Sequence, residues 1–567
     1  MAETEKPIIY QILPRLFGNE KSVNAPNGDL IENGSGKLSA FTPAVLREIK
    51  NMGCTHIWYT GLLEHATRTD YSGYGIRNDH PAVVKGKAGS PYAIKDYYDI
   101  DPDLADNIPD RMQEFEALVE RTHREGLKII IDFVPNHVAR QYGSDAKPEN
   151  IDDLGEKDNI QSAFAIHNNF YYIPDQPLVL NFAHGTPDEN PYSESPAKVT
   201  GNDCFTAYPG RNDWYETVKL NYGIDYLNGY SGHFDPIPDT WHKMYAILCF
   251  WASKNIDGFR CDMAEMVPVA FWAWVIPRVK QQFPGALFIA EVYNPSLYRD
   301  YLWIGKFDYL YDKVGLYDTL RNIICGHQSA KAITYCWQAV DAIQANMLNF
   351  LENHDEQRIA SDFFAGDPEK ALPALTVSAC MHKNPLLIYA GQELGERGMD
   401  AEGFSGMDGR TSIFDYWSVA SLRNWYNNGK PNTDLLTDSQ KALRTFYTKV
   451  LTLCNKSHAI REGQFFDLMY VNPPGANFNP DKQFAFMRKA GNELLLIAVN
   501  FDERDVGVSV FLPASVFDYF EINKAVVTSA KDLLTGEKMS AKIAPDSFYP
   551  MRIKKYNAKI VKFFMKK

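Results

Sequence analysis

Four short segments that carry acidic residues stand in a fixed order along this chain of 567 residues. They read DFVPNH at 132–137, GFRCDMAEM at 258–266, FIAEVY at 288–293 and NFLENHDE at 349–356. Each segment begins in an apolar run and stops abruptly at acids, His or Asn. This pattern is typical of a buried strand that ends at a working site rather than at an ordinary turn.

The residue types in these segments indicate a particular chemistry. Arg260 and Asp262 are two positions apart, so on a strand their side chains leave the same face. The guanidinium favours an ionised carboxylate, which a nucleophile attacking an acetal carbon requires. Glu291 follows the apolar run FIA, and apolar surroundings favour the protonated form that suits a general acid. One ionised and one protonated carboxyl match retaining glycoside hydrolysis, and Asp355 would then stabilise positive charge in the transition state.

A parallel barrel would bring these acids together. Eight apolar runs are predicted strands: 8–17, 55–63, 127–133, 257–263, 286–293, 306–314, 347–353 and 385–391. Amphipathic stretches of helical length separate most of them, for example 43–53 and 111–126. The alternation predicts an α/β fold, a (β/α)8 TIM barrel whose site lies at the carboxyl ends of the strands. We therefore expect Asp132, Asp262, Glu291 and Asp355 to converge on one cleft.

Two further regions interrupt or follow the barrel. Residues 138–238 are rich in Asn, Asp, Gly, Pro and Tyr, and a structureless loop of this length is implausible. We predict an inserted irregular domain there, after the third strand. Residues 1–137 and 239–457 would form the barrel, and short alternating strands predict a C-terminal antiparallel β-sandwich over 458–567.

Composition excludes several classes of function. The net charge of −13 disfavours nucleic-acid partners, which need a basic surface. No apolar run approaches the roughly 20 residues of a membrane span. Eight Cys without a CxxC pair indicate reduced thiols rather than a disulfide framework. The N-terminus lacks the form of a signal peptide, which leaves a cytoplasmic protein and an exported, processed one both open. The oligomeric state is open too.

At this point the chain resembles glycoside hydrolase family 13, the α-amylase family, whose four signature segments match the four segments above in order. The resemblance implies that Asp262 is the nucleophile, Glu291 the acid/base and Asp355 the transition-state stabiliser. It further implies substrate-binding roles for a second group of residues: Arg260, His137 and His354 at the sugar, Asp132 as support for the Arg, and Tyr92, in SPYAIKDYYDIDP at 90–102, as an aromatic platform.

Departures from the family pattern bear on metal binding. Many amylases carry Lys-His directly after the nucleophile segment, and the His assists a structural calcium. Here Glu265 and Met266 occupy those positions, although Asn136 matches one calcium ligand. A polar loop, NEKSVNAPNGD at 19–29, offers oxygen ligands for a cation or is simply solvated. The chemistry itself requires no cofactor, and a structural calcium remains open.

The sequence thus predicts a retaining hydrolase of α-glucosidic bonds, mainly α-1,4, in starch-type oligo- or polysaccharides. VKLN at 218–221 resembles a motif of the neopullulanase and cyclomaltodextrinase branch. Enzymes of that branch carry an N-terminal domain, which we do not expect here because the first barrel strand is predicted at 8–17. Alternatives on the same site are an α-glucosidase, a transglycosylase or a sucrose-type enzyme. A non-catalytic carbohydrate-binding relative is a further class, but such proteins typically lose a catalytic acid.

Two more expectations concern ligands. A metal-dependent hydrolase would use Asp132, His137, Asp262 and His354, but only 13 His occur and no HxH pair is present. The inserted region carries Tyr208, Trp214, Tyr215 and Tyr222, whose flat rings could stack on sugar faces. Trp214 follows the loop-like GRND, so we expect it to be the exposed ring among them.

Overall fold

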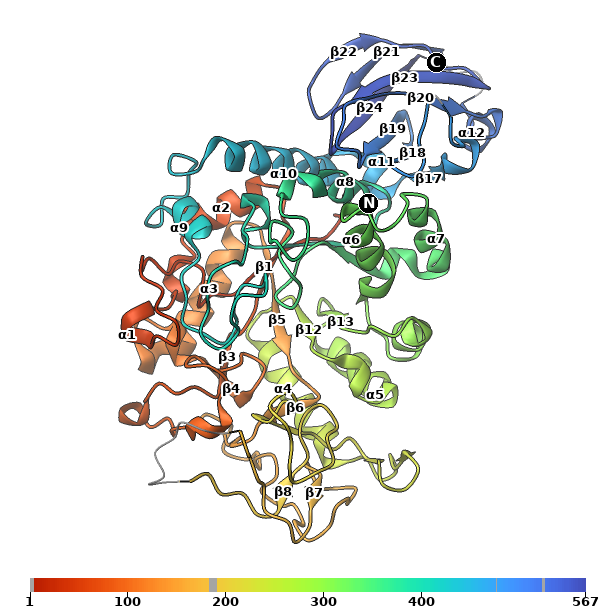
Figure 1. The fold of residues 1–567 in the computed structure, drawn as a ribbon. Coiled ribbons are helices and arrows are strands. Elements are labelled where there is room, and N and C mark those ends of the chain that lie inside the picture. The colour runs from red at the N-terminus through yellow and green to blue at the C-terminus, as the bar shows by residue number, and fades with distance from the viewer. Residues whose placement is uncertain (1–4, 183–190, 476, 523–525, 567) are drawn as a thin grey trace.

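The computed structural model describes residues 5–182, 191–475, 477–522 and 526–566, and a closed barrel of parallel strands forms its centre (Figure 1). The barrel closes in the order β1-β16-β15-β14-β13-β12-β5-β2. Its strands are β1 (Ile8–Ile12), β2 (His56–Tyr59), β5 (Lys128–Phe133), β12 (Gly258–Cys261), β13 (Leu287–Ala290), β14 (Tyr309–Tyr311), β15 (Met347–Phe350) and β16 (Leu386–Tyr389). Each predicted strand contains one of these, so the predicted (β/α)8 barrel is confirmed.

The barrel interior explains why the site lies at one end. Apolar side chains fill its centre: Ile9, Trp58, Ile130, Ile289, Leu348 and Leu387. Side chains two residues apart on a strand share a face. The inward row of β5 therefore passes from Ile130 to Asp132, and that of β13 from Ile289 to Glu291, just past the carboxyl end of its strand. The core thus ends in acids at one end of the barrel.

Helices surround the barrel as the periodicity of the sequence predicts. In α2, Thr42 accepts a hydrogen bond from the Val45 backbone N–H, and Pro43 stands at the first helical position. The longer helices of the barrel region are α2 (Pro43–Asn51), α3 (Arg111–Arg124), α4 (Asp239–Ser253), α5 (Val269–Gln282), α8 (Leu372–Cys380) and α10 (Asp438–Lys456). Shorter ones are α1 (Leu30–Asn33), α6 (Asp318–Ile324), α7 (Ala332–Ala339), α9 (Ala420–Tyr426) and α11 (His458–Glu462).

The region between β5 and α4 is built of short strands and loops. Strand β6 (His137–Ala139) pairs antiparallel with β9 (Thr217–Lys219), which joins the two ends of this region beside the barrel. The other strands are β7 (Tyr172–Ile173), β8 (Ala197–Lys198), β10 (Ile224–Asp225) and β11 (Ser231–Gly232). No helix occurs in the described part of 138–238. In Figure 1 this region lies on the side of the barrel away from the C-terminal sheet.

A C-terminal antiparallel sheet follows the barrel. Six strands pair in the order β17-β18-β19-β24-β21-β22, and β20 pairs with β23 in a second, two-stranded sheet. Their bounds are β17 (Gln464–Asp467), β18 (Gln483–Ala490), β19 (Glu493–Asn500), β20 (Val506–Leu512), β21 (Val526–Asp532), β22 (Lys538–Ser540), β23 (Ser547–Ile553) and β24 (Asn557–Lys566), with α12 (Ala514–Tyr519) after β20. This is the predicted sandwich.

Two predictions from composition are also tested. All eight Cys are free thiols, as predicted. Across the described ranges, no helix combines the length and the apolar character that crossing a bilayer demands.

Candidate active site

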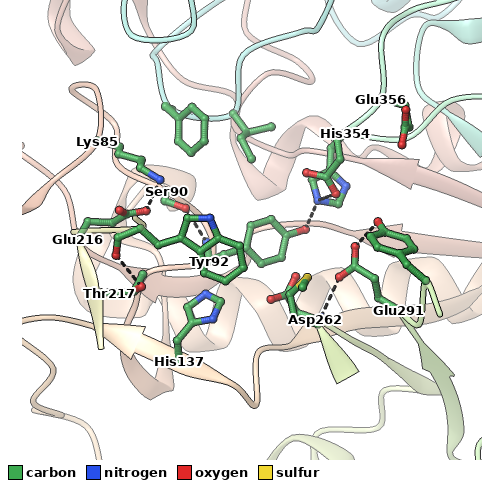
Figure 2. Close-up of a pocket in the computed structure, with 16 residues that line it drawn as sticks. Lys85, Ser90, Tyr92, His137, Glu216, Thr217, Asp262, Glu291, His354 and Glu356 are labelled. Carbon is green, nitrogen blue, oxygen red and sulfur yellow. Dashed lines mark hydrogen bonds and ion pairs between the residues drawn. The ribbon is translucent and has the colours of Figure 1, made fainter. Parts of the chain in front are cut away.

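A cleft of about 300 Å³ opens at the carboxyl ends of the barrel strands. Its lining residues follow several different strands: Lys85, Ser90, Tyr92, His137, Trp214, Glu216, Thr217, Asp262, Met263, Glu291, Tyr293, His354, Asp355, Glu356, Ile413 and Phe414. The three predicted catalytic acids are all among them. Figure 2 shows Asp262 and Glu291 side by side, with His354 above Glu291 and Tyr92 between the two ends of the cleft.

One arginine organises the acids. The Arg260 guanidinium is fully buried, and its Nη1 donates to Asp262 Oδ1 at 2.7 Å. Its Nη2 lies 2.8 Å from Glu291 Oε2, an ion pair without hydrogen-bond angles. Asp132 Oδ1 lies 3.5 Å from Nη1. Three carboxylates therefore share one positive charge, which neutralises only part of their combined charge.

Glu291 receives more hydrogen bonds than the sequence suggests. The Tyr293 hydroxyl donates to its Oε1 at 2.5 Å, and the Met263 backbone N–H donates to its Oε2 at 2.8 Å. Met263 stands in the left-handed region at φ 41°, which turns the chain sharply after Asp262. These donors hold the Glu291 carboxyl in one orientation beside Asp262.

The ionisation of Asp262 differs from the expectation. The sequence indicates that Arg260 keeps this carboxyl ionised. In the folded protein, burial raises the pKa of Asp262 well above its usual value; Arg260 opposes this effect, and the charge of Glu291 adds to it. Burial outweighs the guanidinium because Arg260 divides its charge among three acids. Asp262 therefore favours the protonated form more strongly than an exposed Asp does.

Asp355 and His354 form the opposite wall. The Asp355 side chain is 44% exposed to the cleft, and its Oδ2 lies 3.2 Å from His354 Nε2. The cleft walls still remove enough water that burial, followed by the charge of Glu291, raises the pKa of Asp355 to about 7. Burial lowers the pKa of His354 well below its usual value, so this imidazole is neutral. Gln11 Nε2 lies 2.7 Å from its Nδ1 and fixes the ring.

Of the remaining predicted residues, Tyr92 and His137 line the cleft, whereas Asp132 does not line it and lies beside Arg260. The Tyr92 ring stacks on His354 at 5.1 Å, and its hydroxyl lies 2.6 Å from His354 Nε2. Asp132 accepts from Trp58 Nε1 at 3.1 Å and from the Gly61 N–H at 3.3 Å, and burial raises its pKa to about 6. Burial also lowers the pKa of His137 to about 3, so a neutral imidazole faces the cleft.

Several lining or supporting residues escaped the sequence analysis. Glu265, noted only as a departure from the family, accepts from the Tyr293 and Asn294 backbone N–H groups at 3.0 Å each. It thereby holds the loop that carries Glu291. Tyr311 accepts from Arg260 Nε at 3.2 Å. The only sequence signal for Tyr311 was an inward-facing Tyr on the strand next to β13, and nothing in the sequence indicated that it contacts Arg260.

Among the four aromatic residues of the inserted region, Tyr208 and not Trp214 is the exposed ring, so the expectation for Trp214 was wrong. Trp214 is half-buried and lines the cleft, with its ring 5.3 Å from that of His137. Tyr215 and Tyr222 are buried at 6% and 3% exposure, and the Tyr222 hydroxyl donates to the Pro135 carbonyl. Tyr208 is exposed, but it is not among the lining residues of the cleft.

Asn136, the candidate calcium ligand, is fully engaged with protein groups. Its Nδ2 donates to the Gly201 carbonyl at 2.7 Å, and its Oδ1 accepts from Lys219 Nζ at 2.8 Å. Lys219 belongs to VKLN, is 2% exposed and pairs with Asp203 at 2.5 Å. A positive ammonium already occupies the oxygen that a cation would need, so these residues do not fit a calcium ion.

The loop at 19–29 uses its polar groups internally. Asn19 Nδ2 donates to the Asn33 and Trp417 carbonyls, and Asn24 Nδ2 donates to the Ser418 carbonyl. Asp29 caps α1 by accepting from two backbone N–H groups of that helix. These contacts give the loop a structural role without an ion.

Comparisons with known proteins agree with this geometry. The family described as "Alpha amylase, catalytic domain" matches residues 11–286 and 318–444, which is more than half of the chain. The α-amylase MalA of Haloarcula japonica is 26% identical over 403 residues, which cover 70% of this chain and 45% of that protein. A cyclomaltodextrinase of a Bacillus species is 24% identical over 509 residues, covering 88% of this chain and 73% of that protein.

Solved structures share the whole fold. An α-amylase from Geobacillus thermoleovorans, complexed with acarbose, superposes with a TM-score of 0.64 at 18% identity. A maltogenic α-amylase from Thermotoga neapolitana gives 0.63 at 18% identity. Each match covers 99% of this chain and 99% of the other. At such identities the likeness concerns the fold.

Proposed function

Because the chain belongs to the α-amylase family of glycoside hydrolases, we propose that it hydrolyses α-glucosidic bonds, mainly α-1,4, in starch-type oligo- or polysaccharides by double displacement. One observation carries the proposal: Asp262 and Glu291 meet neighbouring nitrogens of a single buried guanidinium. Two carboxyls held this close favour the short spacing of retaining enzymes, about 5–5.5 Å, over the wider spacing of inverting ones.

In the first step, Asp262 attacks the anomeric carbon and forms a glycosyl ester. Glu291 donates its proton to the glycosidic oxygen, which leaves with the aglycone. Tyr293 and Met263 hold the Glu291 carboxyl toward the bond through their hydrogen bonds. In the second step, Glu291 takes a proton from water, and the water releases the sugar from Asp262.

The other residues orient the sugar and stabilise positive charge as it develops. Asp355 would accept hydrogen bonds from sugar hydroxyls and face the oxocarbenium-like transition state. His137 and His354, both neutral, can donate or accept hydrogen bonds without adding a positive charge that opposes the reaction. The Tyr92 ring offers a flat face to the sugar, and Asp132 supports Arg260.

No step of this mechanism uses a metal ion. We therefore propose that the chemistry requires no cofactor and that Lys219 takes the structural place of a cation beside Asn136. Turnover measured in excess chelator, well below the melting temperature, should equal turnover in buffer alone. A loss of turnover that calcium restores would contradict this.

An exo-acting α-glucosidase or a transglycosylase on the same residues is the second candidate. One observation favours it: Lys85 and Glu216 form a 2.7 Å ion pair at the end of the cleft away from Glu291 (Figure 2). Both side chains are largely buried, so the pair would end the row of sugar sites. Lys85→Ala would then admit longer chains on that side.

Product analysis tests both proposals. Maltoheptaose, pullulan and sucrose are supplied separately, and early products are followed by chromatography and by NMR of the anomeric protons. Endo hydrolysis gives a spread of maltooligosaccharides, whereas exo action gives one short product, and transfer gives products longer than the substrate. Retention gives α anomers first. Initial β anomers, or no cleavage of any α-glucan, would overturn the proposal.

A further inference from the structure

A second group of carboxylates lies outside the cleft. Glu64 is on β3 (Leu63–His65), Asp99 is on β4 (Ile94–Ile100), and Asp145 lies in the first loop of the inserted region. One carboxylate oxygen from each comes within 4.8 Å of the others. Glu64 and Asp99 are buried, whereas Asp145 is exposed. The group contains no residue of the active-site cleft and neither Asn136 nor Lys219.

Glu64 has no hydrogen-bond partner among the described residues. It is 1% exposed, and both of its carboxylate oxygens are buried without a hydrogen bond. The nearest cation, Lys95 Nζ, lies 3.8 Å from Oε1, which is too long for a hydrogen bond. An unsatisfied buried polar group costs about 1–3 kcal/mol, and a charged one costs more. Folding therefore buries, at a cost in free energy, a carboxyl that no described protein group hydrogen-bonds.

The surrounding structure fixes the position of this group. Asp96, opposite Glu64 on β4, accepts from Ser144 Oγ and from the backbone N–H groups of Asp145 and Ala146. The loop is thus tied to β4 through its backbone, which leaves the Asp145 side chain free to face Glu64. Arg111, on α3, binds Asp99 from outside the group. Each carboxylate oxygen has more than one lone pair, so Asp99 can keep this contact and bind an ion.

We propose that Glu64, Asp99 and Asp145 bind a divalent cation of the calcium type, which joins the paired strands β3 and β4 to the inserted region. Carboxylate oxygens are the ligands that hard cations prefer. The three oxygens all lie within 4.8 Å of one another, so one ion can contact all of them, and the exposed side at Asp145 admits the waters that complete its shell. Three protein carboxylates suit Ca²⁺ better than Mg²⁺, which usually keeps several waters and binds through one or two carboxylates.

Charge in the site is consistent with a cation. Lys95 Nζ stays 3.8 Å from Glu64, and Arg111 contacts Asp99 from outside the group, so the carboxylates outnumber the cations beside them. A divalent ion would supply the positive charge that the group lacks.

Calcium binding to the full-length, chelator-treated protein tests the proposal. Calorimetric titration with CaCl₂ should show binding, and Ca²⁺ should raise the melting temperature. Glu64→Gln should weaken Ca²⁺ binding by about tenfold or more and remove the stabilisation, because affinity follows the charge of the oxygen ligands. Asp145→Asn should do the same, and as an exposed position it leaves the core intact. Asp152→Asn, an exposed acid in the same region, is the matched control and should bind Ca²⁺ as the wild type does.

Three results would overturn the proposal. The first is no Ca²⁺ binding by the wild-type protein. The second is wild-type affinity in both Glu64→Gln and Asp145→Asn. The third is binding that Asp203→Asn abolishes and these two variants preserve, which would place the ion beside Asn136 instead. Tighter binding of Mg²⁺ than of Ca²⁺ would contradict the assignment of the ion.

Discussion

Two groups of carboxylates lie on segments that follow carboxyl ends of barrel strands, and they differ in what neutralises them. In the cleft, the buried Arg260 guanidinium reaches three acids, at 2.7, 2.8 and 3.5 Å. At β3–β4, Lys95 stays 3.8 Å from Glu64, and Arg111 binds only Asp99. The first group carries its counter-ion within the fold, and the second leaves a carboxyl unsatisfied.

The difference shows how one residue type serves two purposes. A shared internal counter-ion holds acids in place before any substrate arrives, and such preorganisation is what catalysis needs. Arg260 neutralises only part of the charge around it, and burial raises the pKa of Asp262. A buried carboxyl without a hydrogen-bond partner can be completed by a proton or by an ion from solvent. Variants that remove one acid from each group therefore test the comparison directly.

The largest effect is expected for Asp262→Asn, which removes the charge of the proposed nucleophile and keeps its shape. We expect kcat on maltooligosaccharides to fall by about 10³-fold or more. The melting temperature should stay the same or rise, because burial disfavours the charged form of Asp262. Glu64→Gln is the matched control, and its kcat should be that of the wild type. A kcat above a tenth of wild type in Asp262→Asn would show that another residue is the nucleophile.

Glu291→Gln should separate substrates by their leaving group. Oligosaccharides need a proton on the departing oxygen, so their turnover should fall by about 10²–10⁴-fold. Aryl glycosides with activated leaving groups need little protonation and should be cleaved at nearly the wild-type rate in the first step. Rates for both substrate types, measured side by side, give the result. An equal loss on both would assign the acid role to another group.

Asp132→Asn should act through Arg260 and so have a smaller effect. We expect a loss in kcat of about 10–100-fold, because the guanidinium would lose one of its supports and shift. The KM for the same substrate should change less than kcat. Retention of full activity would show that Asp262 and Glu291 alone position Arg260.

Asp132→Asn should also change how the stability of the protein depends on pH. Asp132 has a folded pKa of about 6, above its unfolded value of about 3.9. Between these values the folded protein binds more protons than the unfolded one, so this carboxyl reduces stability as pH rises from about 4 to 6. Asp132→Asn lacks this loss of stability, so the melting temperature of the variant minus that of the wild type should increase as pH rises from about 4 to 6. A constant difference from pH 4 to 7 would contradict the raised pKa.

The sequence predicts the barrel well because a buried parallel strand leaves a distinct pattern. The runs before Asp132, Asp262 and Glu291 are apolar because both faces of each strand are covered, and they end in acids because the strand ends open into the cleft. Each strand and its first polar residue are local features, so one chain suffices to place them.

Contacts between distant segments could not be predicted in this way. Glu265 accepts hydrogen bonds from the backbone of Tyr293 and Asn294. Lys219 donates to Asn136, which stands 83 positions earlier in the chain. Glu265 and Lys219 could be singled out in the sequence, but the groups that their side chains contact depend on how the loops fold over the barrel. The prediction that Arg260 keeps Asp262 ionised was wrong for a related reason, since the pKa of Asp262 depends on how many acids share Arg260.

The smallest effect is expected for Trp214→Ala, which tests the uncharged wall of the same cleft. Trp214 is half-buried against His137, with its backbone at φ 45°, so its ring is held at the cleft rather than loose in a loop. Loss of a stacking ring should weaken binding by about 1–3 kcal/mol without altering the charges around Arg260. KM for longer oligosaccharides should therefore rise about tenfold or more, and KM for a short aryl glycoside should rise little. Trp214→Phe keeps a flat ring and should recover most of the affinity. Uniform loss on all substrates with a large drop in melting temperature would show instead that the ring supports the fold.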